Sequence, residues 1–220
     1  MIDIANDEQG LAELLAIGPK TVPVVAAGRE WVAGVNLTAV ADLLGLSHDD
    51  TPRLGPDQLV ERLDLVVGTA IRLTRQIPPP HLADKLPNRP RSHLALANHI
   101  IEIAKGFVEV TGGARLSGTR AAAVPDTDLD VEALAERADM IRSDLTRWWN
   151  RTDDERCNRR VDTFTGEQTL HQVLERATWH GAQHVRQLAM VVEALGITPD
   201  RPLAAKDLEG LPVPRKVWDG

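Results

Sequence analysis

From Gly55 onward, apolar residues recur every three or four positions in four long stretches. The stretch 57–77 shows this most clearly, because its apolar residues follow the i, i+3, i+4, i+7 spacing of one helix face. Comparable stretches cover about 92–111, about 128–150 and about 167–195. Four amphipathic helices of this length predict a four-helix bundle.

Residues 1–50 follow a different pattern. A helical stretch over 8–17 is followed by two short β-rich runs, 21–25 and 31–32. A second short helix then begins at Asn36, whose side chain suits an N-cap. The order of helix, hairpin and helix predicts a small α/β segment in front of the bundle.

The polar stretch 47–52 marks the boundary between these two parts. We therefore predict a mainly α protein with two domains, 1–50 and 51–220. Within the second domain, 161–164 predicts a short strand. The proline-containing tail, 197–220, is expected to wrap the bundle without secondary structure.

The charge balance excludes some classes of partner. The 220 residues include 25 Lys and Arg against 32 Asp and Glu, giving a formal net charge of −7, which argues against a nucleic-acid surface. No apolar run approaches the ~18 residues needed to span a bilayer, and 1–10 does not have the pattern of a signal peptide. The single cysteine, Cys157, suits a reducing compartment. We expect a cytoplasmic protein with a small-molecule substrate and no nucleic-acid or membrane partner, and the sequence leaves a homodimer open.

Two histidines interrupt the apolar stripe of the fourth stretch. His180 and His184 are four residues apart and thus lie one turn apart on one helix face, the spacing that two imidazoles need to share a metal ion. Burying either without a partner would cost about 1–3 kcal/mol. Either a metal ion or neighbouring polar groups must satisfy them, and the spacing alone leaves both readings open.

A third imidazole would come from the second stretch, which carries His93 and His99. Periodicity does not choose between them, because 94–110 is apolar on almost every side. Glu102 follows His99 by one turn, where it could accept a hydrogen bond from a ligand, act as a general base, or remain a solvated carboxylate. His171 is predicted to lie on a different helix face, in solvent.

Two segments resemble DinB-like metal-binding proteins. The segment 91–102 resembles the second helix of that family and reads Arg-Ser-His-Leu-Ala-Leu-Ala-Asn-His-Ile-Ile-Glu. The segment 178–188 resembles the family's late His-x-x-x-His segment with its trailing Gln-Leu and reads Thr-Trp-His-Gly-Ala-Gln-His-Val-Arg-Gln-Leu. The resemblance spans about 55–218.

The resemblance implies a divalent metal ion, most often zinc or nickel, bound by His99, His180 and His184, with His93 as a structural histidine. It also implies a transferase or isomerase that uses a low-molecular-weight thiol. In such a reaction we expect Glu102 or a nearby water molecule to accept the proton of the thiol. Three neutral imidazoles with an open position can equally lower the pKa of water. A metal-dependent hydrolase and a non-catalytic structural or sensing site are therefore the alternatives.

Residues 1–45 resemble the C-terminal half of a glutaredoxin, a partial thioredoxin fold, with Thr21, Val22 and Pro23 in the place of its Thr-Val-Pro turn. This resemblance implies that Val22 and Pro23 hold the cysteinyl part of the thiol. The Cys-x-x-Cys helix of glutaredoxins is absent, which excludes disulfide exchange. The alternative is that this segment is a structural cap in which Pro23 only shapes the hairpin.

Overall fold

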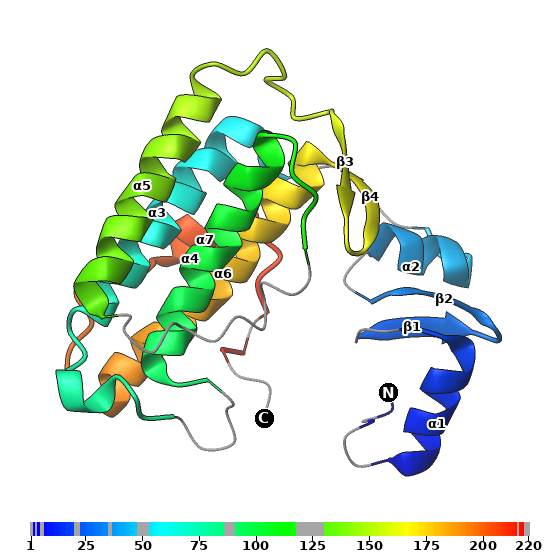
Figure 1. The fold of residues 1–220 in the computed structure, drawn as a ribbon, viewed down its shortest axis with the longest axis horizontal. Coiled ribbons are helices and arrows are strands. Elements are labelled where there is room, and N and C mark those ends of the chain that lie inside the picture. The colour runs from blue at the N-terminus through cyan, green and yellow to red at the C-terminus, as the bar shows by residue number, and fades with distance from the viewer. Residues whose placement is uncertain are drawn as a thin grey trace. The chain divides into compact units, whose positions relative to one another are not determined.

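The chain forms two compact units, Met1–Pro52 and Arg53–Gly220. This computed structural model is mainly helical, as the sequence predicts (Figure 1). No helix within the described residues is long and apolar enough to cross a membrane. The structure describes Ile2, Ile4 and residues 7–19, 23–34, 37–47, 53–85, 91–117, 130–214 and 216–217.

The described residues of the N-terminal unit form two helices and one hairpin in the predicted order. The helices are α1 (Glu8–Ile17) and α2 (Leu37–Leu44), and the antiparallel strands are β1 (Val24–Ala27) and β2 (Glu30–Ala33). The side chain of Asp7 caps α1 by accepting a hydrogen bond from the Gly10 N–H at 2.8 Å.

The strand that a glutaredoxin would place before α1 falls largely outside the described residues, and neither Ile2 nor Ile4 is in a strand. At the start of the hairpin, the carbonyl of Pro23 accepts a hydrogen bond from the Gly34 N–H at 2.8 Å. Pro23 therefore has a structural part in closing the hairpin.

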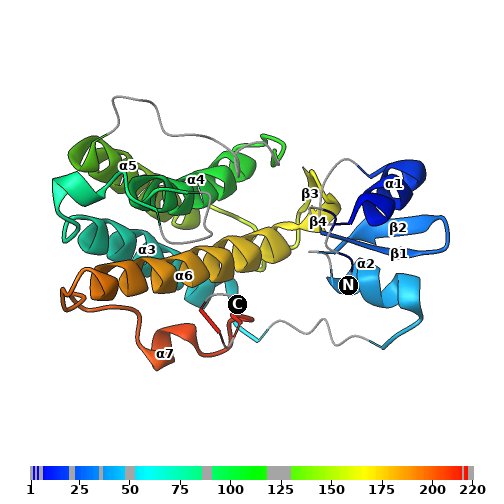
Figure 2. The same cartoon turned by 90° about the horizontal axis from the view of Figure 1, so that it is seen from below.

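The second unit is a four-helix bundle, as predicted. Figure 2 shows α3 and α6 as one neighbouring pair and α4 and α5 as the other, with the two pairs packed together. The four helices are α3 (Pro56–Thr74), α4 (His93–Thr111), α5 (Val131–Trp149) and α6 (Leu170–Ala194). Their apolar faces enclose one core, whose largest fully buried members include Leu59, Leu63, Phe107, Leu134, Leu145, Leu174 and Leu188.

Side-chain caps define where three of these helices begin. Ser92 accepts from the Ala95 N–H at 3.2 Å for α4, and Asp130 accepts from the Ala133 N–H at 2.7 Å for α5. At α6, the hydroxyl of Thr169 accepts from the Gln172 N–H, while the Gln172 side chain accepts from the Thr169 N–H.

Two predictions for the second unit need correction. Helix α6 begins at Leu170 rather than near 167, because the preceding residues form β4 (Gly166–Thr169), which pairs with β3 (Arg160–Thr163). Gly166 closes this hairpin at φ 104°, a conformation that glycine adopts without strain. The tail also contains a short helix, α7 (Ala205–Leu208), although we expected no secondary structure there. A one-turn 3-10 helix, Pro79–His81, follows α3.

Helix α6 lies close to α3 at Gly181. A Cβ added to Gly181 would lie 2.9 Å from Val66 Cγ1, and Val66 is itself buried. Gly181→Ala should therefore lower the free energy of unfolding by about 1–3 kcal/mol through overpacking.

Gly68→Ala is the matched control, because its Cβ would meet Arg142 at an ordinary 3.5 Å. That variant should gain about 0.5–1 kcal/mol from reduced chain entropy. Urea unfolding of the metal-free proteins measures both, and a stabilised Gly181→Ala variant would contradict this account of the packing.

Candidate metal centre

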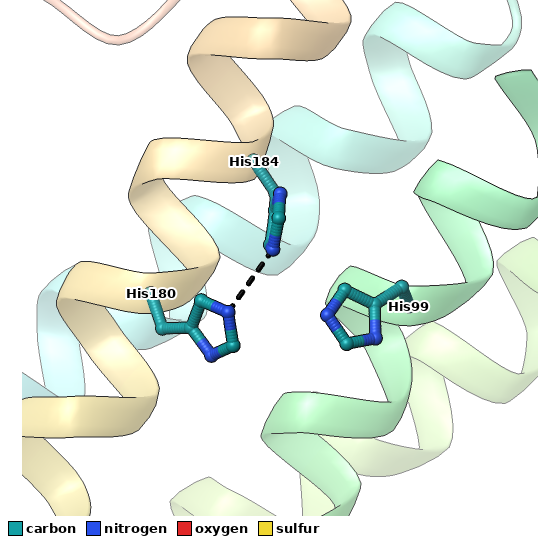
Figure 3. A group of neighbouring side chains, drawn as sticks. All are labelled: His99, His180 and His184. Atoms are coloured by element: carbon teal, nitrogen blue, oxygen red, sulfur yellow. Dashed lines mark hydrogen bonds between the residues drawn. The ribbon is translucent and has the colours of Figure 1, made fainter. Parts of the chain in front are cut away.

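The structure brings His99, His180 and His184 together between two facing helices (Figure 3). His99 projects from α4, while His180 and His184 project from successive turns of α6. One ring nitrogen from each lies within 4.8 Å of the others. The ring centroids of His99 and His184, and those of His180 and His184, are 4.8 Å apart.

All three imidazoles are neutral at pH 7. Burial lowers the pKa of His99 to about 3 and that of His180 to about 2, and the neighbouring imidazole of His184 adds to both shifts. Burial also lowers the pKa of His184, against a smaller opposing effect of its hydrogen bond to Gln187. Neutral imidazole is the form that carries a lone pair for a metal ion.

Gln187 fixes the proton of His184. Nδ1 of His184 lies 2.6 Å from Oε1 of Gln187, an atom that can only accept, so Nδ1 carries the proton and Nε2 keeps its lone pair. The Gln187 amide in turn donates to the carbonyl of Val217 at 3.1 Å. The C-terminal tail therefore orients a candidate ligand through one intervening side chain, an arrangement typical of metal-binding histidines.

The donor set fits a divalent metal ion. The Nε2 atoms of His180 and His184 lie only 3.1 Å apart, so both face the same small volume. Among the described residues, no other histidine, cysteine or carboxylate joins this group of three. Three protein ligands with further positions open is the pattern of catalytic rather than structural zinc sites. Imidazoles alone do not select among zinc, nickel, copper and iron.

Glu102 lies beside the cluster and is not a solvated carboxylate. The residue is only 9% exposed, and it lines one pocket together with His99 and His180. Its Oε1 is 3.5 Å from Nη1 of Arg137 and 3.9 Å from Nζ of Lys105. These two cations help to orient the carboxylate.

Two other histidines have structural partners. Nδ1 of His93 donates to the carbonyl of His81 at 2.8 Å, in keeping with the structural role that the resemblance implied. The prediction for His171 was wrong. This residue is 8% exposed, and its Nε2 donates to the carbonyl of Leu54 at 3.0 Å, because the first turn of α6 packs against the segment before α3.

Burial raises the pKa of Cys157 to about 12, so its thiol is not activated.

The two residues implied in thiol binding lie in the N-terminal unit. Val22 is outside the described residues, and Pro23 stands at the start of β1. Their role in holding a thiol stays a prediction, as does the glutaredoxin resemblance of residues 1–50.

Sequence reasoning missed two residues of the site. Gln187 follows His184 by three positions and so shares its helix face, which could have identified it as a partner. Arg176 precedes His180 by four positions on the same face, and it too lines the pocket. Arg176 could have been identified from the sequence, because it is a charged residue beside the apolar stripe of α6.

Comparison with known proteins supports the fold. No protein-family model matches the chain, and no curated protein matches it. A crystal structure of a DinB-like protein, YjoA from Bacillus subtilis, matches with a TM-score of 0.52 and 18% identity, covering 67% of this chain and 96% of that one. At this level of identity the match concerns the fold. The chain is therefore a mainly helical protein with the fold of a DinB-like protein.

Proposed function

We propose that the protein binds one divalent metal ion through His99, His180 and His184 and uses it in a transferase or isomerase reaction with a low-molecular-weight thiol. The observation that carries this proposal is the set of three neutral imidazoles, with ring nitrogens within 4.8 Å of one another, beside a pocket. A metal ion bound there would supply Lewis acidity that favours loss of a proton from a thiol or water.

Residues of the chain have different roles around that ion. The three imidazoles would hold it, and Gln187 keeps the lone pair of His184 Nε2 directed inward. Glu102, on the same face of α4 as His99, would accept the proton on a carboxylate oxygen. The apolar pocket walls would limit the access of water to the site.

The first test is elemental analysis of the full-length protein purified without an affinity tag that binds metal. We expect close to one zinc or nickel ion per chain, either as purified or after addition of the metal to chelator-treated protein. A stoichiometry that stays near zero after both treatments would contradict the metal site itself.

Calorimetric titration with glutathione and mycothiol then tests thiol use. Both the zinc-loaded and the metal-free protein are titrated, with S-methylglutathione as the control that lacks a free thiol. We expect at least one of the two thiols to bind only the zinc-loaded protein, and S-methylglutathione not to bind. If the zinc-loaded protein binds neither thiol, a metal-dependent hydrolase or a non-catalytic metal site becomes the better account.

A further inference from the structure

The pocket beside the histidines is mostly apolar. It is walled by α4, by α6, by the segment after α4 and by the turn between β3 and β4. Backbone hydrogen bonds join the last two, because the Leu116 N–H donates to the carbonyl of Asp162 and the Phe164 N–H donates to the carbonyl of Leu116. The apolar lining residues are Ile103, Phe107, Leu116, Phe164, Val173 and Ala177.

One cation enters this apolar lining. Arg176 lies on α6 one turn before His180, and its Cζ is 4.9 Å from the ring centroid of Phe164. Its Nη1 is buried and has no hydrogen-bond partner within the part of the chain that the structure describes. A guanidinium withdrawn from water without an acceptor is unfavourable, and its retention there calls for a partner that the described residues do not provide.

The nearest acidic candidate in the pocket does not fill this role. Glu102 lines the same pocket and pairs with Arg137 and Lys105, but it accepts no hydrogen bond from Nη1 of Arg176. The face of Phe164 supports the guanidinium from one side and supplies no oxygen. Arg176 therefore offers N–H donors to whatever occupies the pocket.

We infer that the pocket binds a small organic carboxylate, with the carboxylate paired to Arg176 and the apolar part against Phe107, Phe164 and Val173. A planar guanidinium matches a carboxylate through two parallel hydrogen bonds. A phosphate dianion fits less well, because Arg176 is the only cation among the described lining residues and Glu102 would oppose a second negative charge.

The place of Arg176 relates this ligand to the metal centre. Arg176 and His180 share one face of α6 and are four residues, about 6 Å, apart along the helix axis. A carboxylate held by Arg176 would bring the next atoms of the molecule toward His180 and His99. This inference rests on the proposed function for the reaction itself, and it names small carboxylic acids as the second substrate class.

Benzoate and its neutral analogue benzamide provide the probe pair. Calorimetry on metal-free, full-length protein should show benzoate binding at least tenfold more tightly than benzamide, although the two have nearly the same shape. Equal affinities would overturn the inference, because they would mean that the pocket recognises only the ring. This comparison uses the unaltered protein and does not depend on the folding of a variant.

Substitutions then locate the cation. Arg176→Met should weaken benzoate binding at least tenfold and leave benzamide unchanged. Arg176→Lys should weaken benzoate binding several-fold, because an ammonium cannot form the paired hydrogen bonds. Arg75→Met is the control for net charge, since Arg75 is exposed directly after α3 and pairs with Glu132. Benzoate affinities of Arg176→Met or Arg176→Lys equal to that of the unaltered protein would overturn the inference.

Zinc content separates this inference from the metal proposal. Arg176→Met should bind zinc with the stoichiometry of the unaltered protein, because Arg176 is not among the three clustered ligands. If benzoate binds only the zinc-loaded protein, and equally well to Arg176→Met, the carboxylate is a metal ligand and the assignment to Arg176 is wrong. If no zinc binds but benzoate still depends on Arg176, the carboxylate site stands and the metal proposal fails.

Discussion

His180→Ala and His184→Ala should each reduce the bound metal from about one ion per chain to near zero. Each substitution removes one of the three clustered imidazoles, and the loss should exceed the 10- to 100-fold weakening typical of changes to outer partners of a metal ligand. His99→Ala should have the same effect from the opposite helix. The measurement is zinc affinity by competition with a chromophoric chelator, together with metal content after gel filtration.

The controls separate a ligand from any other histidine. His81→Ala removes an exposed imidazole and should leave zinc affinity unchanged. His93→Ala should also keep the metal, because His93 does not belong to the group of three clustered ligands. If His93→Ala abolished binding while His99→Ala did not, the choice of the third ligand would be wrong.

Gln187 offers a graded version of the same test. Gln187→Ala should weaken zinc binding about 10- to 100-fold, because it frees the ring of His184 to rotate and change tautomer. Gln183 is the matched control. Its amide donates to the same carbonyl of Val217, at 2.7 Å, but it does not contact His184. If Gln183→Ala and Gln187→Ala weakened zinc binding equally, the tail contact rather than the orientation of His184 would be responsible.

The bundle was predictable because three of its long helices carry their own apolar period and α4 is a long stretch that is apolar on almost every side. The stretch expected over 57–77 became α3 (Pro56–Thr74), and the one expected over about 128–150 became α5 (Val131–Trp149). Strand β4 was not predicted because it lacks such a pattern: Glu167 to Thr169 show no alternation of apolar and polar side chains. What makes these residues a strand is pairing with β3 across the turn closed by Gly166.

Part of the candidate site could also be predicted from local sequence patterns, and part depends on contacts between distant segments. The pair His180 and His184 follows from helix geometry alone, because residues four apart share a face. The choice of His99 over His93 needed the family resemblance, since an almost uniformly apolar helix does not indicate which side faces its neighbour. The burial of His171 and the unpartnered guanidinium of Arg176 depend on contacts with distant segments, which periodicity does not encode.

The metal-free protein should lose stability as the pH falls from about 6.5 toward 3. The pKa values of His99 and His180 lie at about 3 and about 2 in the folded protein, against an ordinary value of 6.5. Between these values the unfolded chain binds protons at these sites and the folded chain does not, so acid favours unfolding. Each such histidine contributes up to about 1.4 kcal/mol per pH unit within this window, and the contribution vanishes above pH 6.5.

Carboxylates also titrate in acid, so the test compares variants rather than absolute slopes. His180→Leu removes one buried imidazole and should flatten the pH dependence of the unfolding free energy by up to about 1.4 kcal/mol per unit between pH 6 and pH 4.5. The unaltered protein, unfolded under the same conditions, is the reference. Urea unfolding in the presence of a chelator gives the free energy at each pH. If His180→Leu gave the same slope as the unaltered protein, His180 would have to take up its proton in the folded state as well, and the picture of three neutral imidazoles ready for a metal ion would fail.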